Sequence, residues 1–545
     1  MNASVVLIND PGNGYWDSEV DVVIVGFGGA GACAAIEAAD NSVSVLAIDR
    51  FDGGGATAAS GGVYYGGGTR FQRDAGFDDN ADEMYKYLDR ELGGVVAPQT
   101  LRRFCDENNA NLEWLVRFGM QYGSRFNGDK TSFPGKGVDL YYSGNEVSPA
   151  AEAIAKPAAR GHKVIGEGQT GHIFYDVLKQ AAIKRGVKLW AHSPVTKLLT
   201  DANGSIVGVE VNRLTEGSSA LRRHASTYRW AKRLVGLVTA QSAQTYAGKL
   251  ASIEAENVTT VRVRARKGVV LASGGYIFNH AMMAAETPLY KDAPPLGIPG
   301  CDGSGIALGR SVGGATDRMD YVCASRSIAP PLAFVKGAVV NANGQRFVNE
   351  DAYTGTLGRL VAESPNGTAW LILDRTMLRE ALVNSLPGGG RLLLIHCLPS
   401  LMSIFFGSRK AATLAALAGK CGLPTEALQR TIAEYNESIA INTPDAFGKR
   451  QKYRKAITTG PFYALDISLR SKTAPLFAFT LGGLVVDEDS GEVKRSDGTT
   501  ISGLYATGRA AVGLPSNFYI SGLSIADCVF SGRRAGKHAA ARASS

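Results

Sequence analysis

The sequence lacks the features of several protein classes. It has seven cysteines in 545 residues, with no CxxC pair and no spacing typical of a metal site. No run of about 20 apolar residues occurs, so no membrane-spanning helix is expected. The first residues have no charged segment before a long apolar core, so no signal peptide is expected. We therefore predict a cytoplasmic protein with free thiols and no bound metal.

Proline is scarce, with 20 residues, whereas glycine is abundant, with 66. Average glycine use is about 7%, so this excess indicates many tight turns or close approaches of backbone to a ligand. The formal net charge of +8 is compatible with nucleic acid or a membrane surface, but nothing else in the sequence supports nucleic-acid binding. The length predicts two or three domains.

The strongest motif lies between residues 19 and 50. An apolar run, Val22 to Val25, predicts a buried parallel strand that leads into Gly26-Phe-Gly28-Gly-Ala-Gly31 and an Ala-rich helix. A second apolar run then ends in Asp49. This order of strand, glycine turn, helix, strand and acid is the dinucleotide-binding fingerprint, with the helix start for a pyrophosphate and the acid for a ribose. A structural strand–helix corner is the alternative.

Further glycine clusters follow along the chain. Residues 51–69 contain eight glycines and are expected to wrap against a ligand, with Tyr64 and Tyr65 lining a pocket or packing. Glycine turns also follow predicted strands at 268–276 and 503–513. A closing helix is predicted within 515–536, with Ser521 or Ser524 as its cap.

An insertion at 213–256 interrupts the strand pattern. Cations alternate there with apolar and aromatic residues at a rough helical period, including Arg222, Arg229 and Trp230. The pattern is typical of an amphipathic helix at a membrane interface, so residues 219–250 are a candidate membrane contact. The alternative is a solvated helix that packs on the protein or on a partner subunit.

Together these motifs resemble the FAD-dependent fumarate reductase/succinate dehydrogenase flavoprotein family over nearly the whole chain. The resemblance is carried by VVIVGFGGAG, GGGATAASGG, LASGG, DGSGIALG, GLYATGR and SGLSIAD. It implies an α/β fold, with a Rossmann-like discontinuous FAD-binding domain and an inserted α+β cap domain. The expected boundaries are 1–285 and 456–545 for the FAD-binding domain and 286–455 for the cap.

The resemblance also implies the residues that contact FAD. No histidine occurs between 51 and 69, so we expect non-covalent FAD. Arg509 stands where relatives often have Glu, which leaves the contact to the ribityl chain open. The expected contacts are Gly26, Gly28, Gly29, Ala30, Gly31, Asp49, Arg50, Ala56, Thr57, Ser60, Gly61, Gly62, Val195, Ser273, Gly274, Gly508, Arg509, Gly522, Leu523 and Ser524.

The substrate class is inferred from departures within the family. Family members that reduce dicarboxylates clamp carboxylates with Arg and His, whereas PSNFYISG offers Tyr519 and Ser521 at that place. The chain is similar to the 3-ketosteroid dehydrogenase branch, and LYYSGNE, RFVNEDAY and Asn-x-Tyr-x-Ser-Gly are most like 3-ketosteroid Δ4-(5α)-dehydrogenases. A Δ1-dehydrogenase, a reductase of a polar enoate and a non-enzymatic FAD-binding protein are the alternatives.

The implied reaction removes an α proton and transfers a β hydride to FAD, and it needs an external electron acceptor. We expect Tyr519, with a backbone N–H near Gly522, to polarise the 3-keto oxygen. Ser521 and Tyr321, the latter from the cap, are expected to form the base or its proton relay. These roles are interchangeable on sequence grounds alone.

Overall fold

The structure is a computed structural model that describes residues 6–8, 15–233, 239–256, 258–329, 331–384 and 398–544. The chain divides into two compact units. The first contains residues 1–124, 160–322 and 479–545, and the second contains 125–159 and 323–478. Compact packing therefore changes at 322 and 478 rather than at the expected 285 and 455, and 125–159 join the second unit. The FAD-binding and catalytic roles of these parts remain proposals.

The first unit is built on a largely buried sheet. Its core strand β2, Ser18–Val25, contains the predicted apolar run, in which Val22, Val23 and Ile24 have no exposed surface. It pairs in parallel with β3, Val45–Ile48, and β3 pairs in parallel with β8, Lys188–Trp190. The sheet order is β1-β9-β10-β11-β2-β3-β8; β21 also pairs with β11, and β20 pairs with β21. The remaining bounds are β1 Val6–Leu7, β9 Val195–Thr200, β10 Ile206–Leu214, β20 Glu492–Lys494 and β21 Thr500–Ala506.

One long strand, β11, leads into the glycine turn predicted at 268–276. β11 runs from Val258–Leu271, and its pairing with β2 shifts register between Ala265 and Gly268. Its first half pairs with β10 in antiparallel, and its last residues pair with β21 in parallel. This β-bulge lets the long strand β11 pair with both β10 and β21 along one edge while it pairs with β2 along the other.

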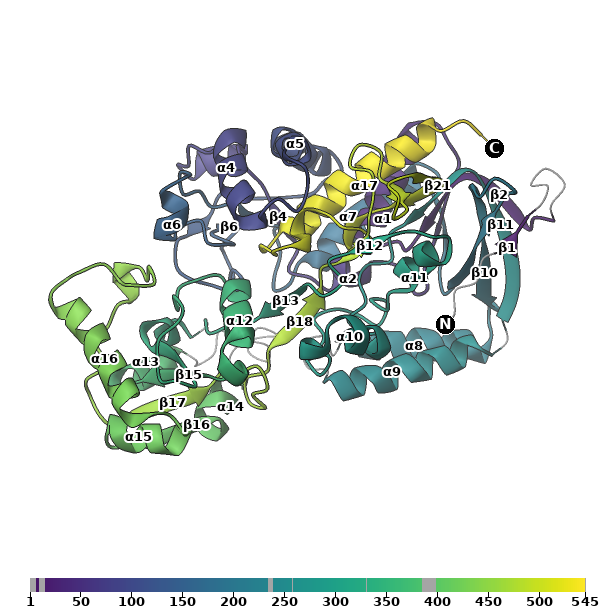
Figure 1. Cartoon of the computed structure of the whole chain (residues 1–545). Helices are drawn as coiled ribbons and strands as arrows, with labels where there is room; N and C mark the ends of the chain where they lie inside the picture. The colour runs from purple at the N-terminus through teal and green to yellow at the C-terminus, as the bar shows by residue number, and fades with distance from the viewer. Residues whose placement is uncertain are drawn as a thin grey trace. The chain divides into compact units, whose positions relative to one another are not determined.

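Two helices from opposite ends of the sequence pack together. α1, Gly29–Asp40, follows β2, and α17, Leu523–Ala541, is the predicted closing helix. Figure 1 shows the two side by side, and Gly532 and Gly536 of α17 face the backbone of α1. Since these glycines have no side chain, the helices approach closely and hold each other's starts in place.

The insertion forms a helical hairpin rather than one helix. α8 is Ser219–Arg233 and α9 is Ala240–Glu254, and the two pack on each other (Figure 1). Residues 234–238, which belong to the predicted interfacial pattern, lie outside the described residues. The apolar side of α8, with Tyr228 and Ala231, is buried against the protein. The exposed side carries Arg222, Arg229 and Trp230.

The other elements of the first unit surround this sheet. They include two helices, α4 and α5, in the region 80–120. Their bounds are α2 Gly55–Ala58, β4 Val63–Tyr65, α3 Arg70–Asp74, α4 Ala81–Leu92, α5 Pro98–Arg117, β7 Gly161–Lys163, α7 Gly171–Lys184, α10 His280–Glu286 and α11 Ser304–Ser311.

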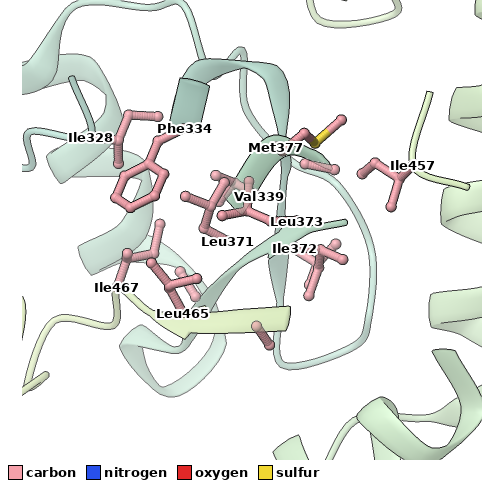
Figure 2. Close-up of a cluster of buried hydrophobic side chains, with 14 of the residues drawn as sticks. Ile328, Phe334, Val339, Leu371, Ile372, Leu373, Met377, Ile457, Leu465 and Ile467 are labelled. Atoms are coloured by element: carbon pink, nitrogen blue, oxygen red, sulfur yellow. The ribbon is translucent and has the colours of Figure 1, made fainter. Parts of the chain in front are cut away.

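The second unit has its own sheet and core. Its strand order is β14-β15-β17-β16, all antiparallel. Figure 2 shows the core, in which Phe334, Leu371 and Leu465 meet. The bounds are β14 Ala338–Asn341, β15 Ala369–Leu373, β16 Ser408–Ala411, β17 Phe462–Asp466, α12 Thr354–Glu363, α13 Arg375–Asn384, α14 Leu398–Phe406, α15 Leu414–Cys421 and α16 Thr425–Ala440.

Candidate cofactor and active site

A pocket lies in the first unit where the parallel strands β2, β3 and β11 end. Ligands of parallel α/β sheets bind at this edge. Thirteen of the twenty expected FAD contacts line the pocket. They are Gly26, Gly28, Gly29, Ala30, Asp49, Arg50, Ala56, Thr57, Val195, Ser273, Gly274, Gly508 and Arg509.

The start of α1 is shaped for a pyrophosphate. Gly26 has φ +93°, and a Cβ there would lie 2.8 Å from the carbonyl carbon of Ala272. Gly29 N donates to Thr57 Oγ1 at 3.1 Å, so the short helix α2 is tied to the turn. The N-cap residue Gly28 has no side chain to cap the helix, so the N–H groups that follow Gly29 N can donate to a ligand with negative charge. The glycine cradle and the uncapped helix fit a dinucleotide.

Asp49 is held at the end of β3 by two backbone donors. Phe27 N donates to Oδ2 at 2.7 Å and Phe51 N donates to Oδ1 at 2.8 Å. Burial raises the pKa of the Asp49 carboxyl above its ordinary value, against these N–H bonds, which lower it. Each carboxylate oxygen can still accept a second hydrogen bond, so the residue fits a ribose hydroxyl.

Arg50 is engaged by carboxylates from two other elements. Its Nε and Nη2 donate to Glu254 at 2.6 and 2.9 Å, and its Nη1 donates to Asp302. Burial opposes the charge, but the two acids outweigh it and raise the guanidinium pKa. Both Arg50 and Asp302 line the pocket, whereas Glu254 ends α9 in the inserted hairpin.

The hairpin also supports the pocket wall through aromatic rings. Phe51 lines the pocket and stacks on Tyr228, with centroids 4.0 Å apart and 8° between the planes. It stacks on His224 at 5.2 Å, and His224 Nε2 lies 2.8 Å from Glu254 Oε1. The insertion is thus a second layer behind the pocket. The sequence indicated neither Phe51 nor Glu254 for this role.

Seven expected contacts do not line this pocket. Gly31 packs inward, because a Cβ there would lie 2.0 Å from Gly26 O. Ser60 Oγ donates to Thr57 O at 2.7 Å, and Gly61 O accepts from Thr170 Oγ1 at 2.9 Å. These bonds fold the glycine loop against the start of α7. The other members of this set are Gly62, Gly522, Leu523 and Ser524.

The start of α17 is a second uncapped helix terminus. Gly522 has φ +93°, and a Cβ there would lie 2.9 Å from Tyr65 N, so the position needs glycine. No side chain caps the helix, so the prediction that Ser521 or Ser524 caps it is wrong. Ser524 Oγ is buried and has no hydrogen-bond partner in the described residues. Leu523 N donates to Ile520 O at 2.9 Å, but an orphaned hydroxyl at a helix start without a side-chain cap fits a polar edge of a ligand.

Strand β4 supports this helix start. Tyr65 N donates to Gly522 O at 3.3 Å. Asn108, which is fully buried, donates from Nδ2 to Tyr65 O and accepts from Gly67 N, both at 3.1 Å. Tyr64 OH donates to Asn108 O at 2.9 Å. Both tyrosines are buried, so Asn108 ties the glycine-rich loop to the proposed site, a role that its sequence context does not signal.

The three candidate catalytic residues all lie in the first unit. Tyr321 was expected from the cap, but it precedes the division at 322. Its carbonyl accepts from Leu481 N at 3.0 Å, and Leu481 O accepts from Ser516 Oγ at 2.7 Å. Leu481 therefore ties the backbone of Tyr321 to the turn that leads to Tyr519 and Ser521.

An aromatic ring packs on Tyr519, and arginines lie over the rings of Phe479 and Tyr321. Tyr519 packs edge-on against Phe479 at 4.8 Å, and the Arg509 guanidinium lies 5.3 Å from the Phe479 ring centroid. Arg318 lies 5.1 Å from the ring centroid of Tyr321 and donates to Asn517 Oδ1 at 3.1 Å. Arg318 has φ +54°, a left-handed conformation that is uncommon for a residue with a side chain. The sequence did not indicate Arg318.

The described residues form neither a metal site nor a membrane-spanning helix. Across the described residues, no three His, Cys, Asp or Glu side chains gather in a metal-binding arrangement. None of the helices in this part of the chain is both long and apolar enough to span a bilayer. The cysteines in the described part of the chain, for example Cys33 and Cys528, are free thiols.

The chain is similar to known proteins over most of its length. The model of a family described as "FAD binding domain" matches residues 21–524. The chain is 38% identical over 507 residues to the 3-oxo-5-alpha-steroid 4-dehydrogenase of Comamonas testosteroni, covering 90% of this chain and 93% of that protein. It is 25% identical to the 3-oxosteroid 1-dehydrogenase of Mycolicibacterium smegmatis, covering 90% and 92%.

A solved structure supports the same relationship. The crystal structure of a 3-ketosteroid-delta4-(5alpha)-dehydrogenase from Rhodococcus jostii, in complex with 4-androstene-3,17-dione, is similar with a TM-score of 0.82. The sequences are 30% identical, and the match covers 99% of this chain and all of that chain. The predicted α/β fold of the flavoprotein family is confirmed.

Proposed function

We propose, from the premise that this chain belongs to the FAD-binding-domain family, that it is a 3-ketosteroid dehydrogenase that introduces a Δ4 double bond into a 5α-saturated substrate. FAD is its cofactor, and the chain is an oxidoreductase acting on CH–CH bonds. The observation that carries the substrate class is the set of hydroxyl-bearing residues, Tyr519 and Ser521, directly before the uncapped start of α17, with Tyr321 tied to the same turn.

The bound cofactor supplies the hydride acceptor for the β hydrogen. The chain's own residues have the other tasks. The α17 start directs N–H groups and the positive end of a helix dipole at developing negative charge. The rigid contact between Gly522 and Tyr65 fixes where those N–H groups lie.

The hydroxyl groups of Tyr519, Ser521 and Tyr321 have separate tasks. Tyr519 polarises the 3-keto oxygen together with a backbone N–H near Gly522, which acidifies the α hydrogen. Ser521 and Tyr321 accept the α proton or relay it. The edge-on contact with Phe479 orients the Tyr519 ring, and its apolar surface favours a substrate with little charge. The reaction would also need an external electron acceptor.

Turnover assays test the proposal directly. Purified protein with bound FAD is incubated with a 5α-saturated androstane-type or cholestane-type 3-ketone and an artificial electron acceptor, and the product is identified. A Δ4 product is expected. Tyr519→Phe should lower kcat by about 100-fold or more, since general acid–base groups contribute about 10²–10⁴-fold. Full turnover in this variant with FAD bound would remove Tyr519 from the mechanism.

Two related activities compete with this one. The similarity to a 3-oxosteroid 1-dehydrogenase favours a Δ1 product, and the position of the double bond decides between them. Arg318 and Arg509 beside the aromatic residues favour a reductase of a polar enoate. Turnover of fumarate and not of any ketosteroid would support that reductase and overturn the proposed substrate class.

We also propose that residues 219–250 contact a membrane surface. The apolar face of α8 packs inward, so contact would use the exposed Arg222, Arg229 and Trp230. Such contact is mainly electrostatic and should weaken as salt screens it. Arg222→Glu with Arg229→Glu should reduce the salt-sensitive part of the binding to vesicles containing phosphatidylglycerol, and unchanged binding would end the idea.

A further inference from the structure

Helix α14 in the second unit exposes three large apolar side chains. Phe406 is 73% exposed, Phe405 66% and Met402 43%. The positions i, i+3 and i+4 put them on one face of the helix. Two neighbouring phenylalanines with most of their surface exposed are unusual for a protein that contacts only water.

The opposite face of the same helix is anchored in the protein. Ile404 is 5% exposed and belongs to the hydrophobic core of this unit, and Ser403 is 4% exposed. Ser408 Oγ donates to Ile404 O at 2.6 Å, just beyond the helix end. α14 packs on β16 and β17. The exposed face is therefore presented by a helix that the fold holds in place, and it is not the core side of the helix.

The charged residues that follow this face in the sequence are cations, although Asp466 of β17 lies next to the helix end, where its N donates to Gly407 O at 3.1 Å. From residue 398 to residue 425 the sequence contains no Asp or Glu, whereas Arg409, Lys410 and Lys420 are exposed. Arg409 and Lys410 are exposed at the start of β16, and Lys410 Nζ lies 5.8 Å from the Tyr463 ring centroid; neither forms an ion pair with a carboxylate in the described part of the chain. Apolar and aromatic side chains next to unpaired cations form the pattern that inserts into the interface of anionic lipids.

We propose that Met402, Phe405 and Phe406, with Arg409 and Lys410, form a lipid-docking face that inserts into the interfacial layer of an anionic bilayer. The occupant is a lipid surface rather than a second copy of the chain. The five residues of this face include two cations and no acid, so the same face on a copy would repel it and not pair with it. This contact differs from the one proposed for α8, since the apolar side chains here point outward. It does not depend on which substrate the enzyme oxidises.

Vesicle co-sedimentation tests the proposal with the FAD-bound protein. Vesicles of phosphatidylcholine and phosphatidylglycerol should pellet the unaltered protein. Phe405→Ser with Phe406→Ser should reduce the bound fraction at least tenfold, and part of the binding of the unaltered protein should persist at 0.5 M salt because apolar insertion is not screened. Ile441→Ser is the matched control, since Ile441 is 64% exposed but stands apart from this face.

Other results would overturn the proposal. Binding that survives the double Phe change but is lost in Trp230→Ser would assign the contact to α8. A dimer that light scattering detects without lipid, and that the double Phe change dissociates, would identify the face as a protein interface. FAD content and circular dichroism equal to those of the unaltered protein show that each variant is folded.

Discussion

Gly536→Ala should destabilise the protein, although alanine is the better helix former. A Cβ at Gly536 in α17 would lie 2.2 Å from Ala34 O in α1, and a Cβ at Gly532 would lie 2.6 Å from Ala30 O. Cβ contacts below 3.0 Å essentially do not occur, so the two backbones must separate by about 0.8 Å or more at Gly536. The obstacle is backbone, which cannot rotate away as a side chain could.

The magnitude follows from two opposing effects. Overpacking of a dense interior costs about 1–3 kcal/mol, and more where backbone must move. The higher helix propensity of alanine stabilises the folded state by about 1 kcal/mol relative to glycine. We therefore expect a net loss of about 2 kcal/mol in the free energy of unfolding. Since the starts of both helices are proposed to hold FAD, the affinity for FAD should fall as well.

Gly248→Ala is the control, because Gly248 lies within α9 and nothing approaches the position of its Cβ within 4 Å. That change should stabilise by about 0.5–1 kcal/mol. Urea unfolding, followed by circular dichroism at saturating FAD, gives a midpoint for each variant. Midpoints are compared because a chain of two compact units need not unfold in one step. If both substitutions raised the midpoint, the close packing of α17 on α1 would be refuted.

Three further changes test the electrostatics of the first unit. Burial raises the pKa of Asp527 to about 6, so its ionisation costs about 3 kcal/mol of the free energy of unfolding above pH 6 and nothing below about pH 4. Asp527→Asn should therefore raise the urea midpoint above that of the unaltered protein at pH 7.5. A gain that persists at pH 4 would contradict this cause. Asp79→Asn breaks the fully buried pair with Arg160 and should cost about 3–5 kcal/mol in thermal unfolding, so an unchanged midpoint would refute its structural role. Glu254→Gln weakens the hold on Arg50 and should raise the Kd for FAD about tenfold by fluorescence titration, whereas an unaltered Kd would separate the hairpin from the pocket.

Periodicity and local motifs predicted the parts of the fold that depend on short stretches of chain. The apolar run ending at Val25, the glycine turn and the acid Asp49 formed the expected strand–helix–strand unit, because each step depends on neighbours in sequence. Unit boundaries were harder to predict. Residues 125–159 join the second unit through packing between distant segments, which has no local composition signal.

The cap of α17 shows a different limit of sequence reasoning. Ser521 and Ser524 are good capping residues by type, but the helix starts at a glycine with φ +93° that no side chain caps. Capping preferences describe helices that need their first N–H groups satisfied within the chain. A helix start that binds a ligand is left open, so the rule is expected to fail at a functional site.

The inserted hairpin shows why an amphipathic pattern does not identify the partner of its apolar face. The period of α8 correctly indicated one apolar side, and a membrane was one reading of it. In the folded chain that side meets Phe51 through Tyr228 and His224, while Glu254 of α9 holds Arg50. Arg50 and Phe51 follow Asp49 directly and line the pocket with it, so their side chains have to be fixed for the pocket to keep its shape. A stacking surface and a carboxylate are what these two side chains require, and a segment about 200 residues later supplies both. The same reasoning explains why α14 is the stronger candidate for lipid contact, since its outward apolar face has no such partner in the described part of the chain.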